Sequence, residues 1–252
     1  MPEISKFAIV ERGAKLSEDV RVGPFTYIGP HVRLGPGCII DSNVSITGKT
    51  TLGERNHVLP LAALGDGLDD AEGELILGEA NVIREHVTIY AGTSQPTRIG
   101  TDNLIMIGCQ IGAGATIGDH GIFVNGTYIG AGAKIEDYVR TSGFVVVSPG
   151  VTVGAYTFTL GYGEMDRDCP PFAMVQGSPY RVRGVNTENL RRCGFGENDI
   201  RDLKSAFREI FTGPEDTPDP AVLRRMLGDK THPHLKRLAE SIQAGLAGRS
   251  AT

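Results

Sequence analysis

The chain has no tryptophan, few aromatic residues and no excess of positive charge. Aromatic residues make up 6% of its 252 positions, and 25 Lys and Arg stand against 30 Asp and Glu, for a formal net charge of −5. A chain of this charge lacks the general basic footprint of a nucleic-acid-binding protein. We therefore expect no nucleic acid among its partners.

Long apolar runs are also missing. No stretch of the sequence is long enough to cross a membrane, and residues 1–6 have no apolar core of the kind found in signal peptides. We therefore expect a cytoplasmic protein without an integral membrane segment.

Cysteine pairs with metal-ligand spacing are absent too. None of the four cysteines forms a Cys-x-x-Cys motif: Cys38, Cys109, Cys169 and Cys193. We interpret them as small packed side chains in a reducing compartment. A zinc ligand or a catalytic thiol is the alternative. No metal site and no cofactor is predicted from these residues.

The chain is rich in a six-residue repeat of aliphatic side chains. The repeat is present at Leu16, Val22, Ile28, Leu34, Ile40, Ile46, Leu52, Val58 and Leu64, then at Leu77, Ile83 and Ile89, and again from Ile99 to Ile135. A period of six is neither helical nor simple strand alternation; it is typical of a parallel β-helix in which three hexapeptides form one triangular coil. The 34 glycines suit the tight corners of such coils. We predict a mostly β protein with this architecture.

The repeat ends near residue 160, and the last part of the chain predicts helices. Glu188–Cys193 reads as a short helix, Asn198 starts a second one, and Asp219-Pro220 is typical of a helix start. We expect a β-helix domain with an extended cap over residues 1–186 and a C-terminal α-helical domain over residues 187–252. The exposed flanks of the repeat favour symmetric association.

Several strings indicate a family, and those after residue 169, which lie outside the generic repeat, are the most specific. They are Val87-Thr88-Ile89, Asp102-Asn103-Leu104, Met106-Ile107, Pro170-Pro171, Gln176-Gly177, Gly184-Val185-Asn186 and Leu190–Phe195. With them, the chain resembles the bacterial UDP-N-acetylglucosamine O-acyltransferases of lipid A biosynthesis over nearly its whole length. The resemblance implies a left-handed β-helix, a homotrimer with active sites between subunits, and transfer of a hydroxyacyl chain from acyl carrier protein to a sugar hydroxyl. It also implies a histidine general base, whose pKa lies near the working pH.

The chain departs from that family where the base is expected. The resemblance places the base at Ala113 and a preceding histidine at Gln110. Other polar positions of the family are also replaced: Tyr90, Gly132, Ser148-Pro149 and Pro60. The usual catalytic histidines are therefore missing, which predicts a divergent substrate or mechanism.

Two histidines are weak candidates for a replacement base. His86 and His120 each follow a repeat aliphatic by three residues, so both should project outward from a coil. Either could act on a substrate brought to it by a neighbouring subunit. Solvated or interfacial side chains are the alternative for both.

The positions that the resemblance assigns to the nucleotide match the family better than the position of the base does. Asn186, Glu188 and Arg192 fall at positions that the resemblance assigns to nucleotide-sugar binding, and an arginine fork suits phosphate. The alternative is a helix start with a solvated charged face. From Arg181 to Arg208, seven basic residues stand against four acids. The resemblance implies that this surface docks acyl carrier protein, although an ordinary mixed surface would look similar.

Three functions follow from these observations. The first is an acyltransferase that uses acyl carrier protein or acyl-CoA as donor and a nucleotide sugar as acceptor, with Ala113 in place of the base. The second is a non-catalytic trimer that binds a nucleotide sugar or an acyl carrier. The third is a trimer that has kept only the scaffold, because fold alone does not settle function.

Overall fold

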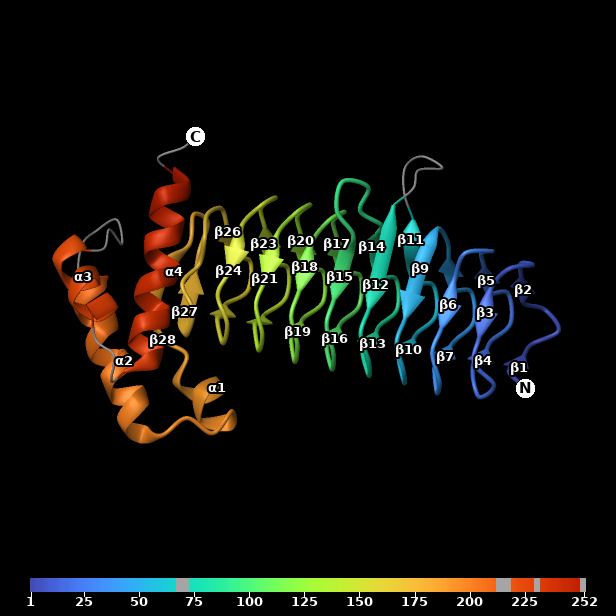
Figure 1. The fold of residues 1–252 in the computed structure, drawn as a ribbon, viewed down its shortest axis with the longest axis horizontal. Coiled ribbons are helices and arrows are strands. Elements are labelled where there is room, and N and C mark those ends of the chain that lie inside the picture. Colours follow the sequence, from blue (N-terminus) through green and yellow to red (C-terminus); the bar gives the residue numbers. More distant parts are fainter. Residues whose placement is uncertain (67–72, 212–218, 229–231, 250–252) are drawn as a thin grey trace.

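The computed structural model describes residues 1–66, 73–211, 219–228 and 232–249. The repeat forms a parallel β-solenoid of stacked coils, and four helices lie at the end opposite the N-terminus (Figure 1). Each coil contributes one short strand to each of three sheets, which we call faces 1, 2 and 3 in chain order. The predicted mostly β solenoid with a helical C-terminal region is confirmed.

Within the described residues, the strands of the three faces are as follows. Face 1 has eleven strands: β1 (Glu3–Ile4), β4 (Arg21–Val22), β7 (Ile39–Ile40), β10 (His57–Val58), β13 (Val82–Ile83), β16 (Leu104–Ile105), β19 (Ile122–Phe123), β22 (Arg140–Thr141), β25 (Phe158–Thr159), β27 (Ala173–Gln176) and β28 (Arg181–Val185). Face 2 has nine: β2 (Ile9–Val10), β5 (Tyr27–Ile28), β8 (Ser45–Ile46), β11 (Ala63–Asp66), β14 (Thr88–Tyr90), β17 (Gln110–Ile111), β20 (Tyr128–Ile129), β23 (Val146–Val147) and β26 (Glu164–Met165). Face 3 has eight: β3 (Lys15–Leu16), β6 (Arg33–Leu34), β9 (Lys49–Leu52), β12 (Glu74–Leu77), β15 (Thr97–Ile99), β18 (Thr116–Ile117), β21 (Lys134–Ile135) and β24 (Thr152–Val153).

The parallel register stacks equivalent aliphatic residues in the core. Ile111 pairs with Ile129 on face 2, and both side chains are fully buried. In the two-residue strands the second residue points inward, and the first points outward because successive side chains of a strand alternate. Burying one aliphatic side chain per face and per coil stabilises each coil by about 1.5–3 kcal/mol per side chain. Every coil needs these inward aliphatic side chains, and the six-residue period therefore recurs in each of them.

The turns between faces also stack, and they form three corners. We call them corner 1–2, corner 2–3 and corner 3–1, after the faces that they join. Residues at one repeated position of a corner adopt a positive φ, as His86 (58°) and His120 (59°) do. Their backbone N–H groups donate to carbonyls of the preceding coil, for example His120 to Thr101 at 2.9 Å. Residues at equivalent positions of successive coils therefore lie on the same corner.

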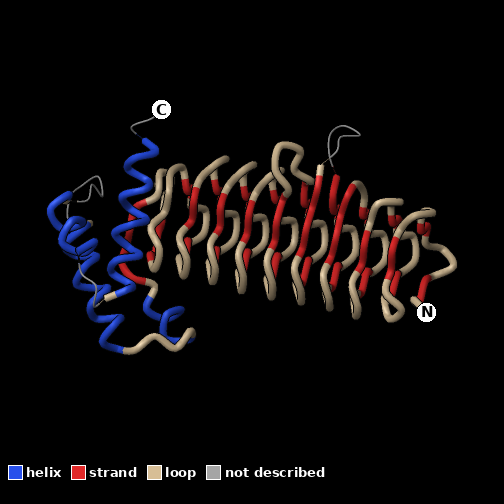
Figure 2. Tube along the Cα trace, in the orientation of Figure 1, coloured by secondary structure: helices blue, strands red, loops and turns tan. Residues whose placement is uncertain are grey.

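The helices are α1 (Thr187–Arg192), α2 (Glu197–Ile210), α3 (Pro220–Gly228) and α4 (Pro233–Arg249). Figure 2 shows helix confined to one end of the molecule. The predicted start at Asp219-Pro220 is confirmed, because the Asp219 Oδ1 accepts a hydrogen bond from the Ala221 N–H at 2.7 Å. In α2 the buried residues recur at helical spacing: Ile200, Leu203, Ala206, Phe207 and Ile210. Of the helices that the structure describes, none is long and apolar enough to span a membrane.

Candidate functional site

Corner 2–3 holds Ala113, the position where the base was expected. Residues 112–115 and 130–133 both read Gly-Ala-Gly-Ala, and residues 148–151 read Ser-Pro-Gly-Val. The coils stack directly, because the Gly132 N–H donates to the Ala113 carbonyl at 3.0 Å. A Cβ atom added to Gly132 or Gly150 would meet nothing within 4 Å. Over these three coils the corner carries no titratable side chain, and it is open at Gly132 and Gly150.

Outward side chains of face 2 lie beside this corner. Gln110, Tyr128 and Val146 point outward in register on face 2 and are exposed. The loop after β14 packs against the same corner, since the Gln95 Nε2 donates to the Gly114 carbonyl at 2.6 Å. The Thr97 hydroxyl accepts from the Gly114 N–H at 2.8 Å. Sequence reasoning missed this loop contact, which the repeat does not encode.

His120 lies on a different corner, corner 3–1. Its Nδ1 is 2.9 Å from the Oδ2 of Asp102, one coil below, so the carboxylate orients the imidazole ring. The ring also stacks on Tyr138, with centroids 4.6 Å apart. The stack continues from Tyr138 to Tyr156 at 4.9 Å and from Tyr156 to Phe172 at 5.8 Å. We call these four rings, from His120 to Phe172, the aromatic ladder.

His86 lies on the third corner, corner 1–2, where it is exposed. It follows Glu85, whose pKa is lowered mainly by the hydrogen bond from Arg84, with the charge of His86 as a smaller cause. Ala113, His120 and His86 therefore occupy three separate corners. Within one chain the structure brings neither histidine to the corner of Ala113.

The predicted nucleotide-sugar residues all lie at α1 but do not form one cluster. Asn186 is buried, and its Nδ2 donates to the Tyr156 carbonyl at 2.8 Å, so this amide fastens α1 to the aromatic ladder. Glu188 and Arg192 face outward and pair with each other at 3.0 Å, with side chains 68% and 61% exposed. Of the three, only Glu188 and Arg192 are open to a ligand.

The basic surface around α1 and α2 is partly neutralised. Three of its arginines have carboxylate partners: Arg191 with Glu197 at 2.6 Å, Arg192 with Glu188 at 3.0 Å and Arg201 with Asp202 at 3.5 Å. No ion pair is found for the other four in the part of the chain described here: Arg181, Arg183, Lys204 and Arg208. These four supply the free positive charge of this surface.

Two buried polar atoms lack a partner, and sequence reasoning missed both. Among the described residues they are the Nε of Arg140 and the Oδ1 of Asn125. Arg140 is the outward residue of β22 on face 1, and Asn125 lies in corner 1–2 one coil below. One feature of the sequence could have pointed to Arg140. It is a charged residue at an outward strand position whose partners in the neighbouring coils, Ile122 and Phe158, are apolar. Over the same described part of the chain, no group of three His, Cys, Asp or Glu side chains could hold a metal ion.

Comparisons with known proteins agree on the kind of protein. Residues 13–48 match the model of the bacterial transferase hexapeptide repeat. Residues 168–250 match a model described as UDP N-acetylglucosamine O-acyltransferase, domain 2. The fold and these matches define a transferase built on hexapeptide repeats.

Relatives narrow the class to one family. An acyl-[acyl-carrier-protein]--UDP-N-acetylglucosamine O-acyltransferase of Saccharophagus degradans is 39% identical over 84% of this chain and 85% of that protein. The protein of the same name from Stutzerimonas stutzeri is 34% identical over 98% of this chain and 99% of its own length. The solved structure of LpxA from Acinetobacter baumannii covers 96% of both chains with a TM-score of 0.89 and 29% identity. The chain belongs to the UDP-N-acetylglucosamine O-acyltransferase family.

Proposed function

We propose that this protein is an acyltransferase that moves a hydroxyacyl group from acyl carrier protein, or from acyl-CoA, to a nucleotide sugar of the UDP-N-acetylglucosamine class. The observation that carries the proposal is a relative of that activity matched at 34% identity over 98% of the chain. Arg192 and Glu188, exposed on α1, support it because a guanidinium can bind the diphosphate and a carboxylate can accept hydroxyl hydrogen bonds.

The proposed mechanism differs from the family pattern at the base. Ala113 cannot take a proton, and loss of a positioned general base costs about 10²–10⁴-fold in rate. Either another side chain supplies the base, or the acceptor is an amine that reacts without one. His120 is the better-placed candidate, because Asp102 orients its ring and the opposite nitrogen is left to face a substrate. It would serve only if corner 3–1 of one subunit met a substrate held at a neighbour. His86 is the second candidate.

The proposed assembly is a homotrimer. Corner 1–2 carries a line of exposed large apolar side chains: Phe7, Phe25, Leu61, Ile107, Phe144 and Tyr162. Tyr162 is 79% exposed, and among the described rings it stacks on Phe144 alone, at 5.6 Å. Such a line on a single chain favours burial against other copies. Changing Phe144 to Asp is expected to dissociate the trimer into monomers, as measured by light scattering.

Acyl carrier protein is the proposed docking partner of the basic surface. Arg181, Arg183, Lys204 and Arg208 carry positive charge and form no ion pair among the described residues. Opposite charge on a partner mainly accelerates association and selects the partner.

We place the reaction in the cytoplasm, since all four cysteines are free thiols, as expected in a reducing compartment.

A second candidate function is binding without catalysis. It is favoured by the composition of corner 2–3, which carries no titratable side chain from residue 112 to residue 115, from 130 to 133 or from 148 to 151. Under this alternative the protein would bind the nucleotide sugar or the acyl carrier through α1 and release it unchanged.

An acyl-transfer assay separates the two. Purified protein would be incubated with acyl carrier proteins that carry hydroxyacyl groups of several lengths. The acceptor would be UDP-N-acetylglucosamine or its 3-amino analogue, and mass spectrometry would identify the products. Ala113→His would be measured beside the unchanged protein. We expect turnover that falls in His120→Ala and in Asp102→Asn, and a higher rate toward the hydroxyl acceptor in Ala113→His.

The outcomes are distinct. Turnover that survives both His120→Ala and His86→Ala would remove these residues as bases. If it survives only with the 3-amino analogue, the amine acceptor is the explanation. No turnover with any donor, together with nucleotide-sugar binding that Arg192→Ala abolishes, would establish the binding function instead.

A further inference from the structure

We propose that the Arg140 guanidinium binds a phosphate group of the substrate, at a position between face 1 and the last turn of α1. The inference rests on the proposed function and adds a residue to it. Arg140 is not among the positions that the resemblance assigns to nucleotide-sugar binding. It is far in the sequence from those positions, which are Asn186, Glu188 and Arg192.

The first observation is a buried guanidinium nitrogen without a partner, on a side chain that is itself half-buried. The Nε of Arg140 is buried, and it has no hydrogen-bond partner in the described ranges. Arg140 is aligned with Ile122 below it and Phe158 above it, and both neighbours are half-buried apolar side chains. A buried polar donor without a partner is costly, so native structures rarely keep one unless a ligand, a water or another chain completes it.

The second observation is the position of Arg140 beside α1. The Asn189 Nδ2 donates to the Tyr138 carbonyl at 3.0 Å, which anchors α1 two residues before Arg140. Cys193, the residue that follows α1, lies close enough for the charge of Arg140 to act on its thiol. Arg140 thus approaches α1 from the solenoid, near the helix that carries the exposed Arg192.

Charge and geometry favour an anion with several oxygens. An arginine fork has donors on Nε and on both terminal nitrogens, and phosphate can accept two of them at once. Partial burial strengthens such a pair because fewer waters compete. Two substrates of the proposed reaction carry this chemistry: the diphosphate of the nucleotide sugar and the phosphate of the donor's pantetheine arm. A carboxylate of a neighbouring copy is the competing partner.

Binding measurements test the proposal and identify the source of the phosphate. Isothermal titration would compare UDP-N-acetylglucosamine, UDP and coenzyme A as ligands of the intact protein, of Arg140→Gln and of Arg140→Lys. Arg98→Gln is the matched control, because Arg98 is an exposed arginine at an outward strand position of face 3. We expect Arg140→Gln to weaken one ligand class by about tenfold or more. Arg140→Lys should recover part of the loss, and Arg98→Gln should bind normally.

The thiol of Cys193 provides a second readout that does not depend on activity. Burial raises the pKa of Cys193, and the charge of Arg140 acts in the opposite direction. A phosphate bound to Arg140 would cancel that charge and raise the pKa further, so the thiolate fraction would fall. We expect the bound ligand to slow alkylation of Cys193 by iodoacetamide at pH 8. Arg140→Gln should slow it in the absence of ligand and remove the ligand effect.

Failure of this inference differs from failure of the proposed function. If the unchanged protein binds and turns over substrate while Arg140→Gln matches it in both measurements, only the role of Arg140 is overturned. If Arg140→Gln separates the copies without changing ligand affinity, Arg140 pairs with a neighbouring chain and the inference is wrong. If the unchanged protein binds no phosphate ligand and transfers no acyl group, both proposals are wrong.

Discussion

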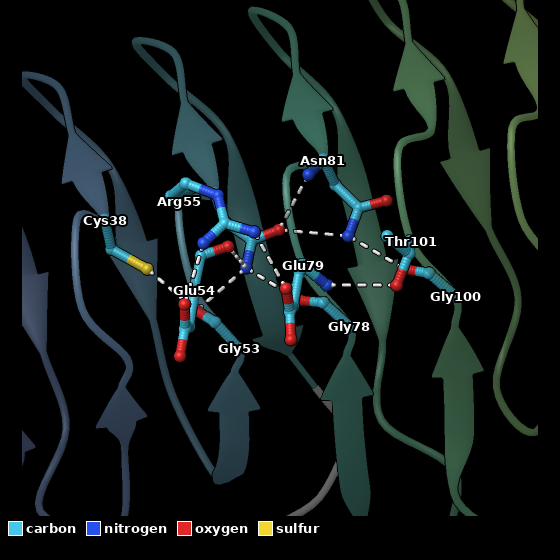
Figure 3. Close-up of polar contacts among 10 residues, drawn as sticks. Cys38, Gly53, Glu54, Arg55, Gly78, Glu79, Asn81, Gly100 and Thr101 are labelled. Carbon is cyan, nitrogen blue, oxygen red and sulfur yellow. Dashed lines mark hydrogen bonds and ion pairs between the residues drawn. The ribbon is translucent and has the colours of Figure 1, made fainter.

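Asn81 is joined to Asn56, one coil below, through a single oxygen. The Asn56 Oδ1 accepts the Asn81 backbone N–H at 3.0 Å and the Asn81 Nδ2 at 2.9 Å. Asn103 repeats the arrangement on Asn81 at 3.0 Å for both bonds, and the Gly121 N–H completes it on Asn103 at 2.7 Å. Figure 3 shows Asn81 within this part of corner 3–1, where its Nδ2 also reaches the Gly100 carbonyl. The buried amides tie successive coils together inside the solenoid.

Removing the middle of this ladder should destabilise the solenoid. In Asn81→Ala the backbone N–H of Asn103 loses its acceptor in a buried site, and the Asn103 Nδ2 keeps only its backbone acceptors. We expect the free energy of unfolding to fall by about 2–4 kcal/mol, measured from urea denaturation. Thr116→Ala, an exposed change on face 3, should alter it by less than about 0.5 kcal/mol. An unchanged midpoint in Asn81→Ala would show that water replaces the lost bonds.

Two glycines of corner 2–3 should differ sharply in their tolerance of alanine. A Cβ on Gly112 would lie 2.5 Å from the Ala131 backbone nitrogen, whereas one on Gly132 would meet nothing within 4 Å. Gly132 has a φ of 66°, so Gly132→Ala should cost only the backbone term of about 1–2 kcal/mol. Gly112→Ala must move one coil from the next and should cost more. Thermal unfolding of the two variants compares them, and equal shifts would contradict the expectation.

The aromatic ladder should control how firmly α1 is held. The Tyr156 ring contacts Tyr138 and Phe172 by stacking and Phe195 edge-on at 5.0 Å, while the Tyr156 carbonyl accepts from Asn186. Tyr156→Ala removes these ring contacts and should destabilise the C-terminal region by about 2–4 kcal/mol. Amide hydrogen exchange should then accelerate in α1 and α2 and stay unchanged in the first coils. Thr116→Ala, an exposed change on face 3, is the control and should leave this exchange unchanged.

Buried thiols should make the protein sensitive to alkaline pH. Burial raises the pKa of Cys109 to about 11 and that of Cys169 to about 12, from an ordinary value of 9.0. Above pH 9 these thiols ionise in the unfolded chain but keep their protons in the folded one. The unfolded state then binds fewer protons, so stability falls as pH rises through this range.

Urea titrations at pH 8 and pH 10 would measure that loss of stability. Cys109→Ala with Cys169→Ala should remove part of the pH dependence, although each variant also creates a small cavity that lowers stability at both pH values. In the native protein at pH 8, alkylation should be confined to Cys193, the only one of the four thiols that is not fully buried. Rapid labelling of Cys109 would contradict the packing described here.

Much of the fold could be predicted because the repeat is local. A six-residue period places every inward side chain, and a coil of about eighteen residues makes Asp102 and His120 stacked neighbours, since they are eighteen apart. The helix starts were also readable, and Asp219 caps α3 as expected. The family was recognisable from short strings, most specifically those after residue 169, and comparison over 98% of the chain confirmed it.

By itself the sequence determined the solenoid, its inward residues and its helical end, because each depends on neighbours within one coil or one helical turn. Tertiary structure alone decided what the candidate residues do. The separation of Ala113, His120 and His86 onto three corners follows from the six-residue register, but the contacts of Asn186 and Arg140 do not. In the described residues the Asn186 amide donates to the Tyr156 carbonyl, and the Arg140 Nε is buried without a partner. These outcomes depend on how α1 docks against a distant part of the solenoid. Such docking is governed by side-chain packing between elements far apart in the chain, which a repeat of six residues does not encode.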